Sequence, residues 1–521
     1  MSTYHDSRRP SRSRRRSRRL LAGGLVAGSL VAGAAGLVGM AGPVGAEDLP
    51  HSGGNASTVR NERAHEEGGR DGAGREPVGG EATGRDGTGR HGDGRDEQGA
   101  REGDGPGRGR DAVSVPCDTK KLIGALVRVN AEGGGALRLA PKCTYTLTGA
   151  FQQPDDYDGG IRDAREAADS AENPGDAEAP PRNPADDKAG LPVIYHPVTI
   201  EGAGATIERA THAEVFRFFT VRDGGELTLR DVELVNGRSA AEGGAVHVVH
   251  GASAVIERVT VVRSRSFSKE GGGGALFNDG NMVVRDSTFI DNHAAGAVGK
   301  GGGLLNGGVL TVHSSTFKDN SAVAYGGGLG NYRGAAEVRT STFAHNTAGQ
   351  GGGLASFSAR TRVADSKVVG NSAQTGGGIA NSDALIYLRG LEVRDNTATG
   401  NGGGISTFQG LVPLDDSVVA GNTAHGHGGG IHAVKSNLLV RESAVTRNHA
   451  VEAKSTGGGV SVSMGRLALY RSTVVDNRSR VPAGGIHADK TQAKVDGETV
   501  ISGNNPTNCV GGKVPVAHCF R

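Results

Sequence analysis

Two short motifs recur in register through the second half of this sequence, and they constrain its fold more than any other feature. The first motif is Gly-Gly, a small residue and then an aliphatic residue, and its copies lie 25 to 30 residues apart. The second is an apolar residue followed three positions later by asparagine. The aliphatic residues of the first motif are Val246, Leu276, Leu304, Leu329, Leu354, Ile379, Ile405, Ile431, Val460 and Ile486. The asparagines of the second are Asn292, Asn320, Asn346, Asn371, Asn396, Asn422, Asn448, Asn477 and Asn504. A fixed period of this kind predicts a repeat architecture.

Each repeat has room for two or three short strands and for no helix. Strands with β alternation, such as residues 309–312, are separated by glycine or asparagine turns. This pattern excludes leucine-rich and helical repeats, and a propeller blade needs about 40 residues. One repeat per coil of a solenoid fits the period, and parallel crossovers prefer the right hand. We therefore predict an all-β, right-handed parallel β-helix of about 11–12 coils, preceded by a short capping helix at Thr119 to Asn130. Both asparagine columns, including Asn278, Asn306, Asn331 and Asn381, are interpreted as structural.

The remaining segments suggest a secreted protein. Residues 1–46 combine many arginines, a Gly- and Ala-rich apolar stretch and small residues before a cleavage site after Ala46. This arrangement is typical of a signal peptide. Ser17-Arg18-Arg19-Leu20-Leu21 resembles a twin-arginine motif, and an ordinary Sec signal with a long basic start is the alternative. Residues 47–112 are a predicted disordered mixed-charge linker. Residues 113–190 form a predicted N-terminal cap with a disordered acidic insertion at about 152–189. The β-helix then occupies 191–504, and a C-terminal cap occupies 505–521.

Four cysteines are present, one pair at each end of the predicted folded body: Cys117, Cys143, Cys509 and Cys519. Three pairings are open. We expect Cys117–Cys143 and Cys509–Cys519, because each would tie down a terminus where fraying begins. Neither pair has the spacing of a zinc or redox site. We expect no cofactor and no metal.

The two motifs resemble the repeats of polymorphic outer-membrane proteins, and Gly273-Gly274-Ala275-Leu276 with Phe289-Ile290-Asp291-Asn292 is the nearest copy. More broadly, residues 117–504 are similar to secreted β-helix proteins of the pectin-lyase-like superfamily. The resemblance implies a parallel β-helix and leaves a surface or adhesive role open. The superfamily also includes enzymes that cut acidic polysaccharides, so the resemblance makes their catalytic motifs candidates in this sequence.

That search finds no catalytic residue to assign. Gly426-His427-Gly428 and Asp415-Asp416 match isolated elements of polygalacturonase-like hydrolases. However, Asp416-Ser417 occupies a repeat position, as Asp286-Ser287 and Asp365-Ser366 do. A calcium cluster beside an arginine base, which pectate-lyase-like catalysis would need, is not predicted either.

The breaks in the repeat are the candidate ligand surface. Tyr332, Phe357 and Phe408 share one column, interrupted by Ser382, and could stack against sugar rings. His425 and His427 lie in a glycine turn and lack a third metal ligand. Ordinary packing is the alternative for the aromatic residues.

We therefore favour a secreted, extracellular, monomeric β-helix that binds a polysaccharide or a cell-surface component without catalysis. The alternatives are a polysaccharide lyase or glycoside hydrolase of this fold, and a structural cell-envelope component. The formal net charge of +2 gives no indication of nucleic-acid binding. After signal cleavage, no membrane contact is expected.

Overall fold

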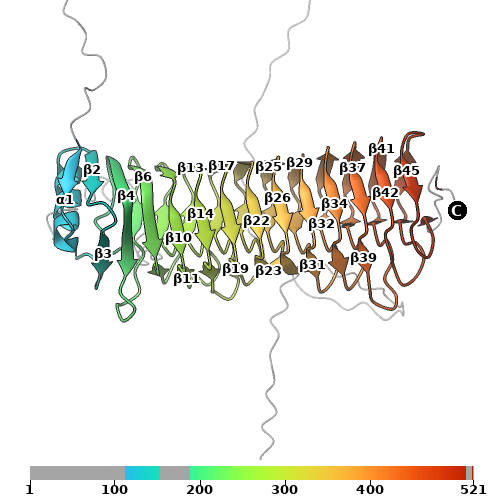
Figure 1. The fold of residues 1–521 in the computed structure, drawn as a ribbon, viewed down its shortest axis with the longest axis horizontal. Helices are drawn as coiled ribbons and strands as arrows, with labels where there is room; N and C mark the ends of the chain where they lie inside the picture. The colour runs from blue at the N-terminus through green and yellow to red at the C-terminus, as the bar shows by residue number, and fades with distance from the viewer. Residues whose placement is uncertain (1–111, 153–187, 512–518, 520–521) are drawn as a thin grey trace, which may run out of the picture. The chain divides into compact units, whose positions relative to one another are not determined.

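The computed structural model describes residues 112–152, 188–511 and 519. They form a parallel β-solenoid of about 14 turns with one helix at its N-terminal end (Figure 1). The predicted signal peptide lies outside these residues, and so does all but the last residue of the predicted linker. Most of the predicted acidic insertion also lies outside them. No described helix is long and apolar enough to cross a membrane.

Three sheets run along the solenoid, and every strand pair in them is parallel. Sheet A has 25 strands, sheet B has nine and sheet C has twelve. A typical coil passes from sheet C to two successive strands of sheet A and then to sheet B. Successive coils pair in register, so Phe289 lies beside Phe317 and Phe317 beside Phe343. Residues at equivalent repeat positions therefore form columns along the solenoid.

The strand bounds follow this order. The first strands of sheet A are β1 (Val113–Val115), β2 (Gly135–Leu139), β4 (Pro197–Arg209), β6 (Glu226–Val235), β9 (Ser253–Glu257), β13 (Asn281–Arg285), β17 (Val309–His313), β21 (Ala335–Arg339), β25 (Arg360–Ala364), β29 (Leu385–Arg389), β33 (Leu411–Asp415), β37 (Asn437–Arg441), β41 (Arg466–Tyr470) and β44 (Gln492–Val495). Its second strands are β3 (Thr144–Leu147), β10 (Thr260–Val262), β14 (Thr288–Ile290), β18 (Thr316–Lys318), β22 (Thr342–Ala344), β26 (Lys367–Val369), β30 (Glu392–Arg394), β34 (Val418–Ala420), β38 (Ala444–Thr446), β42 (Thr473–Val475) and β45 (Val500–Ser502).

Sheets B and C have shorter strands. Sheet B contains β7 (Arg238–Ser239), β11 (Arg265–Ser266), β15 (His293–Ala294), β19 (Ser321–Ala322), β23 (Thr347–Gln350), β27 (Ser372–Thr375), β31 (Thr397–Ala398), β35 (Thr423–Ala424) and β39 (His449–Ala450). Sheet C contains β5 (Phe219–Val221), β8 (Val246–Val248), β12 (Leu276–Asn278), β16 (Leu304–Asn306), β20 (Leu329–Tyr332), β24 (Leu354–Phe357), β28 (Ile379–Ser382), β32 (Ile405–Phe408), β36 (Ile431–Val434), β40 (Val460–Ser463), β43 (Ile486–Asp489) and β46 (Cys509–Gly511).

The core is a stack of identical side-chain positions. The rings of Phe289 and Phe317 are stacked with centroids 4.7 Å apart, and those of Phe317 and Phe343 with centroids 5.0 Å apart. The aliphatic residues of the first motif are all fully buried. The glycine motif lets neighbouring backbones meet, because a Cβ on Gly327 would lie 2.4 Å from the carbonyl oxygen of Gly352.

The asparagines of the second motif form a hydrogen-bonded ladder, as the structural interpretation predicts. In each coil the asparagine side chain bonds to the asparagine of the next coil, as Asn346 Nδ2 does to Asn371 Oδ1 at 3.0 Å. The same oxygen accepts the backbone N–H of Asn346 at 2.9 Å. Asn371 Nδ2 in turn donates to the carbonyl of Phe343 at 2.9 Å. Buried turn groups are thereby satisfied without water.

The N-terminal region departs from the prediction in two ways. The helix α1 (Thr119–Ala131) forms as expected, and Asp118 caps it by accepting from the N–H groups of Lys120 and Lys121. However, the expected cap is part of the solenoid, since β1 pairs with β2 and β2 with β4. These strands lack both motifs, so counting motifs gave 11–12 coils instead of about 14.

Residues 192–194 contribute no strand to the described solenoid. Ile194 forms only an isolated bridge with Val221, and β5 begins at Phe219. Pro192 has no N–H to donate to a ladder. Both expected disulfides, Cys117–Cys143 and Cys509–Cys519, are present. Disulfides of this kind are typical of a protein that folds outside the cytoplasm.

Candidate ligand-binding face

The predicted aromatic column lies on the outer side of sheet C. Tyr332 of β20 pairs with Phe357 of β24, followed in register by Ser382, Phe408 and Val434 on the next three coils. Each side chain is half-buried. Because strands alternate, the motif aliphatics Leu329, Leu354, Ile379, Ile405 and Ile431 of the same strands point inward. The sequence therefore placed Tyr332, Phe357 and Phe408 correctly on one face.

A second column, which the sequence analysis missed, runs beside it. It consists of the residue immediately before the glycine motif on seven successive coils, and these residues are Lys300, Tyr325, Gln350, Thr375, Asn401, His427 and Thr456. Isolated parallel bridges connect Lys300 to Tyr325 and Tyr325 to Gln350. We call this the pre-glycine column. Aligning the repeats on the residue before the glycines would have revealed it.

Tyr325 joins the two columns. Its ring stacks on Phe357 with centroids 4.1 Å apart and lies 6.1 Å from the ring of Tyr332. Tyr325 is 8 % exposed and packs against Ala355 and Ala380, whose small side chains leave room for a ring on the sheet. Its hydroxyl group is buried and has no hydrogen-bond partner among the described residues. Burial raises the pKa of Tyr325, so the hydroxyl stays protonated and can donate.

Cations already cover parts of these rings. Lys300 Nζ lies 5.1 Å from the centroid of Tyr332 and 5.9 Å from that of Tyr325. Burial lowers the pKa of Lys300, while Glu270 and Glu242 oppose that shift. The guanidinium of Arg333 lies 5.0 Å from the centroid of Tyr332, and Lys435 Nζ lies 5.7 Å from that of Phe408. Each contact is a cation–π interaction that fixes the cation beside the aromatic column.

The connections from sheet B to sheet C are shortest in the middle of this face. Strands β23 and β27 run directly into the next glycine motif. Connections of six residues follow β11, β15 and β39, at residues 267–272, 295–300 and 451–456. The longer connections therefore flank the coils that contain Phe357 and Ser382.

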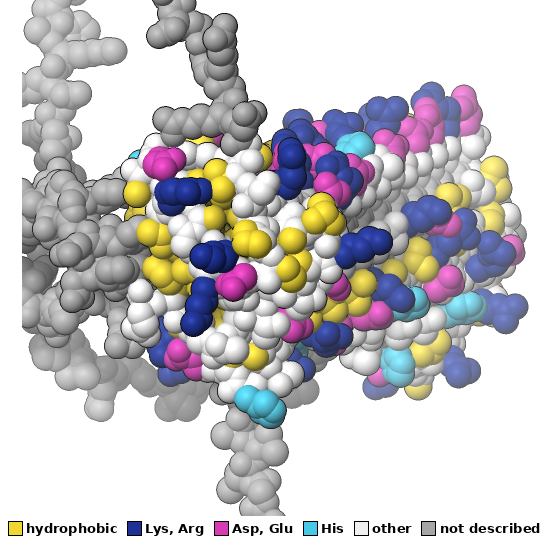
Figure 2. Space-filling view, turned by 60° about the vertical axis from the view of Figure 1, so that its left-hand side comes forward, with side chains coloured by type: hydrophobic (Ala, Val, Ile, Leu, Met, Phe, Trp, Pro, Cys, Tyr) yellow, Lys and Arg dark blue, Asp and Glu magenta, His cyan; other side chains and the backbone are white. Residues whose placement is uncertain are grey.

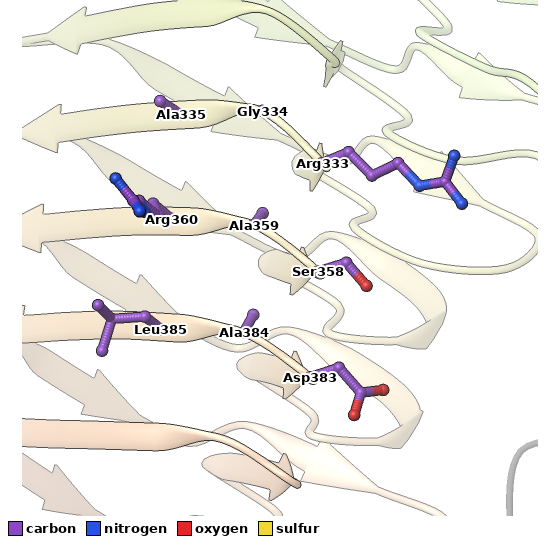
Figure 3. A pocket seen from close by; sticks show the side chains of 9 residues that line it. All are labelled: Arg333, Gly334, Ala335, Ser358, Ala359, Arg360, Asp383, Ala384 and Leu385. Carbon is purple, nitrogen blue, oxygen red and sulfur yellow. The ribbon is translucent and has the colours of Figure 1, made fainter. Parts of the chain in front are cut away.

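A shallow hollow of about 420 Å³ lies where sheet C turns into sheet A, beside the aromatic column (Figure 3). Three consecutive coils line it with Arg333, Gly334, Ala335, Ser358, Ala359, Arg360, Asp383, Ala384 and Leu385. Figure 3 shows Arg333, Ser358 and Asp383 projecting to one side of the turn, and Arg360 and Leu385 standing on the strands at the other side. The hollow thus offers a cation on each side of the corner.

The histidines of the predicted surface are not brought to the aromatic rings of Tyr332 and Phe357. Strand β36, which His427 precedes, lies four coils from β20, a separation of about 19 Å at ~4.8 Å per coil. His427 Nδ1 accepts from the N–H of Thr456 at 3.1 Å, and its ring lies 6.5 Å from that of His432. His425 takes part in backbone hydrogen bonds with Ala398 and Glu452. Among the described residues, no group of three His, Cys, Asp or Glu side chains could hold a metal ion.

The carboxylates that resembled hydrolase elements pair with arginines. Asp415 accepts two hydrogen bonds from Arg441, at 2.7 and 2.6 Å. Asp416 accepts from Arg389 at 3.2 Å. Asp416 also lines a second shallow hollow of about 320 Å³ with Glu442 and Arg471, and these two residues form an ion pair. The expected repeat role of this corner is confirmed, since Ser417 and Ser443 both bond to the neighbouring coil.

Three solved structures resemble the solenoid at low identity. No protein family matches the sequence, and no curated protein is similar to it. The solenoid is similar to the A-module of a mannuronan C-5 epimerase from Azotobacter vinelandii, with 15 % identity, a TM-score of 0.37, and coverage of 76 % of this chain and 96 % of that one. A periplasmic alginate epimerase gives 12 %, 0.36, 72 % and 88 % for the same quantities. A tailspike protein mutant of E. coli bacteriophage HK620, solved in complex with a pentasaccharide, gives 11 %, 0.32, 73 % and 76 %.

Proposed function

We propose that this protein is a polysaccharide-binding β-helix with an adhesive or surface-binding role, and that the aromatic column of sheet C is its binding surface. The observation that carries the proposal is the in-register pair Tyr332 and Phe357, half-buried on adjacent coils, with the ring of Tyr325 stacked on Phe357. An aromatic face is apolar and electron-rich, so it attracts the C–H face of a sugar ring.

The local charges favour a sugar over a cationic ligand. Lys300, Arg333 and Lys435 already occupy the positions above the rings that a ligand cation would take. The side chains of Ser382 and Gln350 add polar groups at intervals along the same face. A linear polymer lying along the solenoid axis could contact several coils at once, which increases affinity without a deep pocket.

Binding without catalysis is part of the proposal. A catalytic centre needs titratable groups converging on one reacting atom. In the described part of the chain, the carboxylates nearest to such an arrangement, Asp415 and Asp416, are held by Arg441 and Arg389 in a repeated corner.

The test is binding of the purified chain to neutral and acidic polysaccharides, followed by co-sedimentation and affinity electrophoresis. The double variant Tyr332→Ala and Phe357→Ala should weaken binding by about tenfold or more. Phe267→Ala is the matched control, because Phe267 is an exposed aromatic residue in the connection after β11, away from sheet C. Equal binding by the double variant and the control would refute the aromatic column as the site. Reducing ends or unsaturated products released from any polymer would refute the non-catalytic role.

A further inference from the structure

A band of unpaired cations runs beside the aromatic column, at the corner between sheets C and A. We define the band by the first corner residue after each sheet C strand and the first and third residues of the following sheet A strand, from β20 to β44. Its cations are Arg333, Arg360, Arg362, Lys435, Arg466, Lys490 and Lys494, and its acidic residues are Glu337 and Asp383. All seven cations are exposed. This excess of positive charge contrasts with the nearly neutral whole chain.

None of these seven cations forms an ion pair with another residue of the described ranges, although ion pairs are common elsewhere on sheet A. Arg339 pairs with Glu337, Arg389 with Asp416 and Arg441 with Asp415. Each of these three arginines is the last residue of its sheet A strand, at the end away from the band, although Glu337 is itself one of the two acidic residues of the band. Figure 2 shows such charged side chains in rows along the length of the solenoid. The far ends of these strands therefore carry paired charges of both signs, whereas the band carries exposed cations that lack such pairs among the described residues.

Four of the seven cations rest on aromatic rings. Arg333 lies over Tyr332 and Lys435 over Phe408, at the distances given above. Arg362 lies 5.8 Å from the centroid of Tyr387, and Lys494 lies 5.5 Å from that of Tyr470. A cation held over a ring keeps its charge and loses part of its conformational freedom before any ligand binds. The band is thus partly organised for an anionic ligand.

The corner hollow gives the band its most defined position. Arg333 and Arg360 come from adjacent coils and stand on opposite sides of the turn (Figure 3). Small residues form the turn between them, because Gly334, Ala359 and Ala384 occupy the same position on three coils. An acidic group entering here could be bound from both sides by guanidinium groups, which suit carboxylate, sulfate and phosphate oxygens.

From these observations we infer that the polymer is an acidic polysaccharide, with its rings on the aromatic column and its anionic groups on this band. The inference rests on the proposed function, because the column and the band share Tyr332 and Phe408 as supports for Arg333 and Lys435. The shared chemistry is a linear glycan with repeated oxyanions, either carboxylates or sulfates. Repetition along the polymer matches repetition along the coils.

The experiment measures the affinity of the full chain for polygalacturonate, for heparin and for an uncharged glucan at low and physiological salt. Arg360→Glu with Arg362→Glu should weaken binding of an acidic polymer by about tenfold or more and remove its salt dependence. Binding of the glucan should stay unchanged. Arg263→Glu with Arg265→Glu is the control, because it makes the same charge change at exposed positions in and before β11 of sheet B.

The outcomes separate this inference from the proposed function. Preference for polygalacturonate identifies carboxylates as the anionic groups, and preference for heparin identifies sulfates. Equal, salt-independent binding of acidic and neutral polymers by the natural chain would overturn the band while leaving the aromatic column intact. An equal loss of affinity in the Arg263→Glu, Arg265→Glu control would show that the effect comes from the net charge of the chain. That result would also overturn the band as the binding site. Tighter binding of duplex DNA than of either acidic glycan would overturn the assignment to a polysaccharide. Circular dichroism and thermal unfolding of each variant establish that it is folded.

Discussion

The inner and outer columns of the solenoid obey different rules. Inside, the same residue recurs coil after coil, as in the asparagine ladder and the stacked rings of Phe289, Phe317 and Phe343. Outside, the residue changes at almost every coil, and the column that begins with Tyr332 continues through Phe357 and Ser382. Inner positions must match the coils above and below, whereas outer positions need only remain compatible with a strand.

Because of this difference, we expect the inner columns to contribute mainly to stability and the outer columns mainly to binding. A repeated inner residue stabilises every coil in the same way, so it carries little information about a ligand. An outer residue that departs from its neighbours contributes little to folding and is free to serve recognition. Substitutions in the two kinds of column should therefore affect different measurements.

The largest loss of stability is expected from Phe317→Ala. Phe317 is fully buried between two stacked rings, and its removal leaves a cavity that the rigid coils cannot close. We expect a cost of about 3–5 kcal/mol in the free energy of unfolding. Urea denaturation measures this cost. Phe267→Ala is the matched control, because Phe267 is 41 % exposed and should cost little. Similar costs at both positions would contradict the comparison.

The asparagine ladder should be the next most sensitive column. Asn371→Ala removes the oxygen that accepts from Asn346 and the donor that satisfies the carbonyl of Phe343. Leaving these buried groups unpaired should cost about 2–4 kcal/mol. Hydrogen exchange should show the loss concentrated in the adjacent coils. Asn437→Ala, at an exposed position of β37, should change neither quantity measurably.

The inner columns could be predicted from the sequence because their residues repeat. The glycine and asparagine motifs gave the period, the class of fold and the structural role of asparagines such as Asn371. The first coils could not be predicted in this way, because β1, β2 and β3 carry neither motif, although they pair in register within sheet A. The coil count was therefore too low.

The outer face was only partly predictable for the same reason. Tyr332, Phe357 and Phe408 were found because they share a repeat position. Tyr325 and Lys300 were missed because the pre-glycine column has no conserved residue type within the chain, and its members meet the aromatic rings only across coils. His427 was grouped with the aromatic residues, yet it belongs to the more distant part of that column, beside Thr456.

His432 of β36 is an outer residue that is nevertheless largely buried, so its protonation should affect the stability of the fold. Burial and the neighbouring His427 lower its pKa to about 4, below the ordinary value of 6.5. The unfolded chain therefore takes up the proton more readily, so stability is complete above about pH 6.5 and falls as the pH drops toward 4. The loss attributable to His432 should be about 1–2 kcal/mol at pH 5.

The matched variant is His432→Ser, because Ser406 and Ser461 occupy the same position on the two adjacent coils. Urea denaturation at pH 7 and pH 5 should show a smaller decrease for the variant than for the natural chain. Other histidines with lowered pKa values, such as His427 and His487, should retain part of the decrease. An unchanged decrease would show that His432 is already accessible to protons in the folded chain.

The smallest effect is expected at the outer ion pair of Asp415 and Arg441. The two side chains are 23 % and 49 % exposed, and solvent screens their attraction. Asp415→Asn should therefore cost less than about 1 kcal/mol, despite the two hydrogen bonds from Arg441. The cost should shrink further in high salt, whereas the cost of Asn371→Ala should not. A salt-independent loss as large as that of the ladder variant would mean that this corner belongs energetically with the inner columns. Corner residues such as Asp415 and Arg441 would then have to be counted among those that stabilise the fold, and only the side chains on the outer faces of the sheets would be free for recognition.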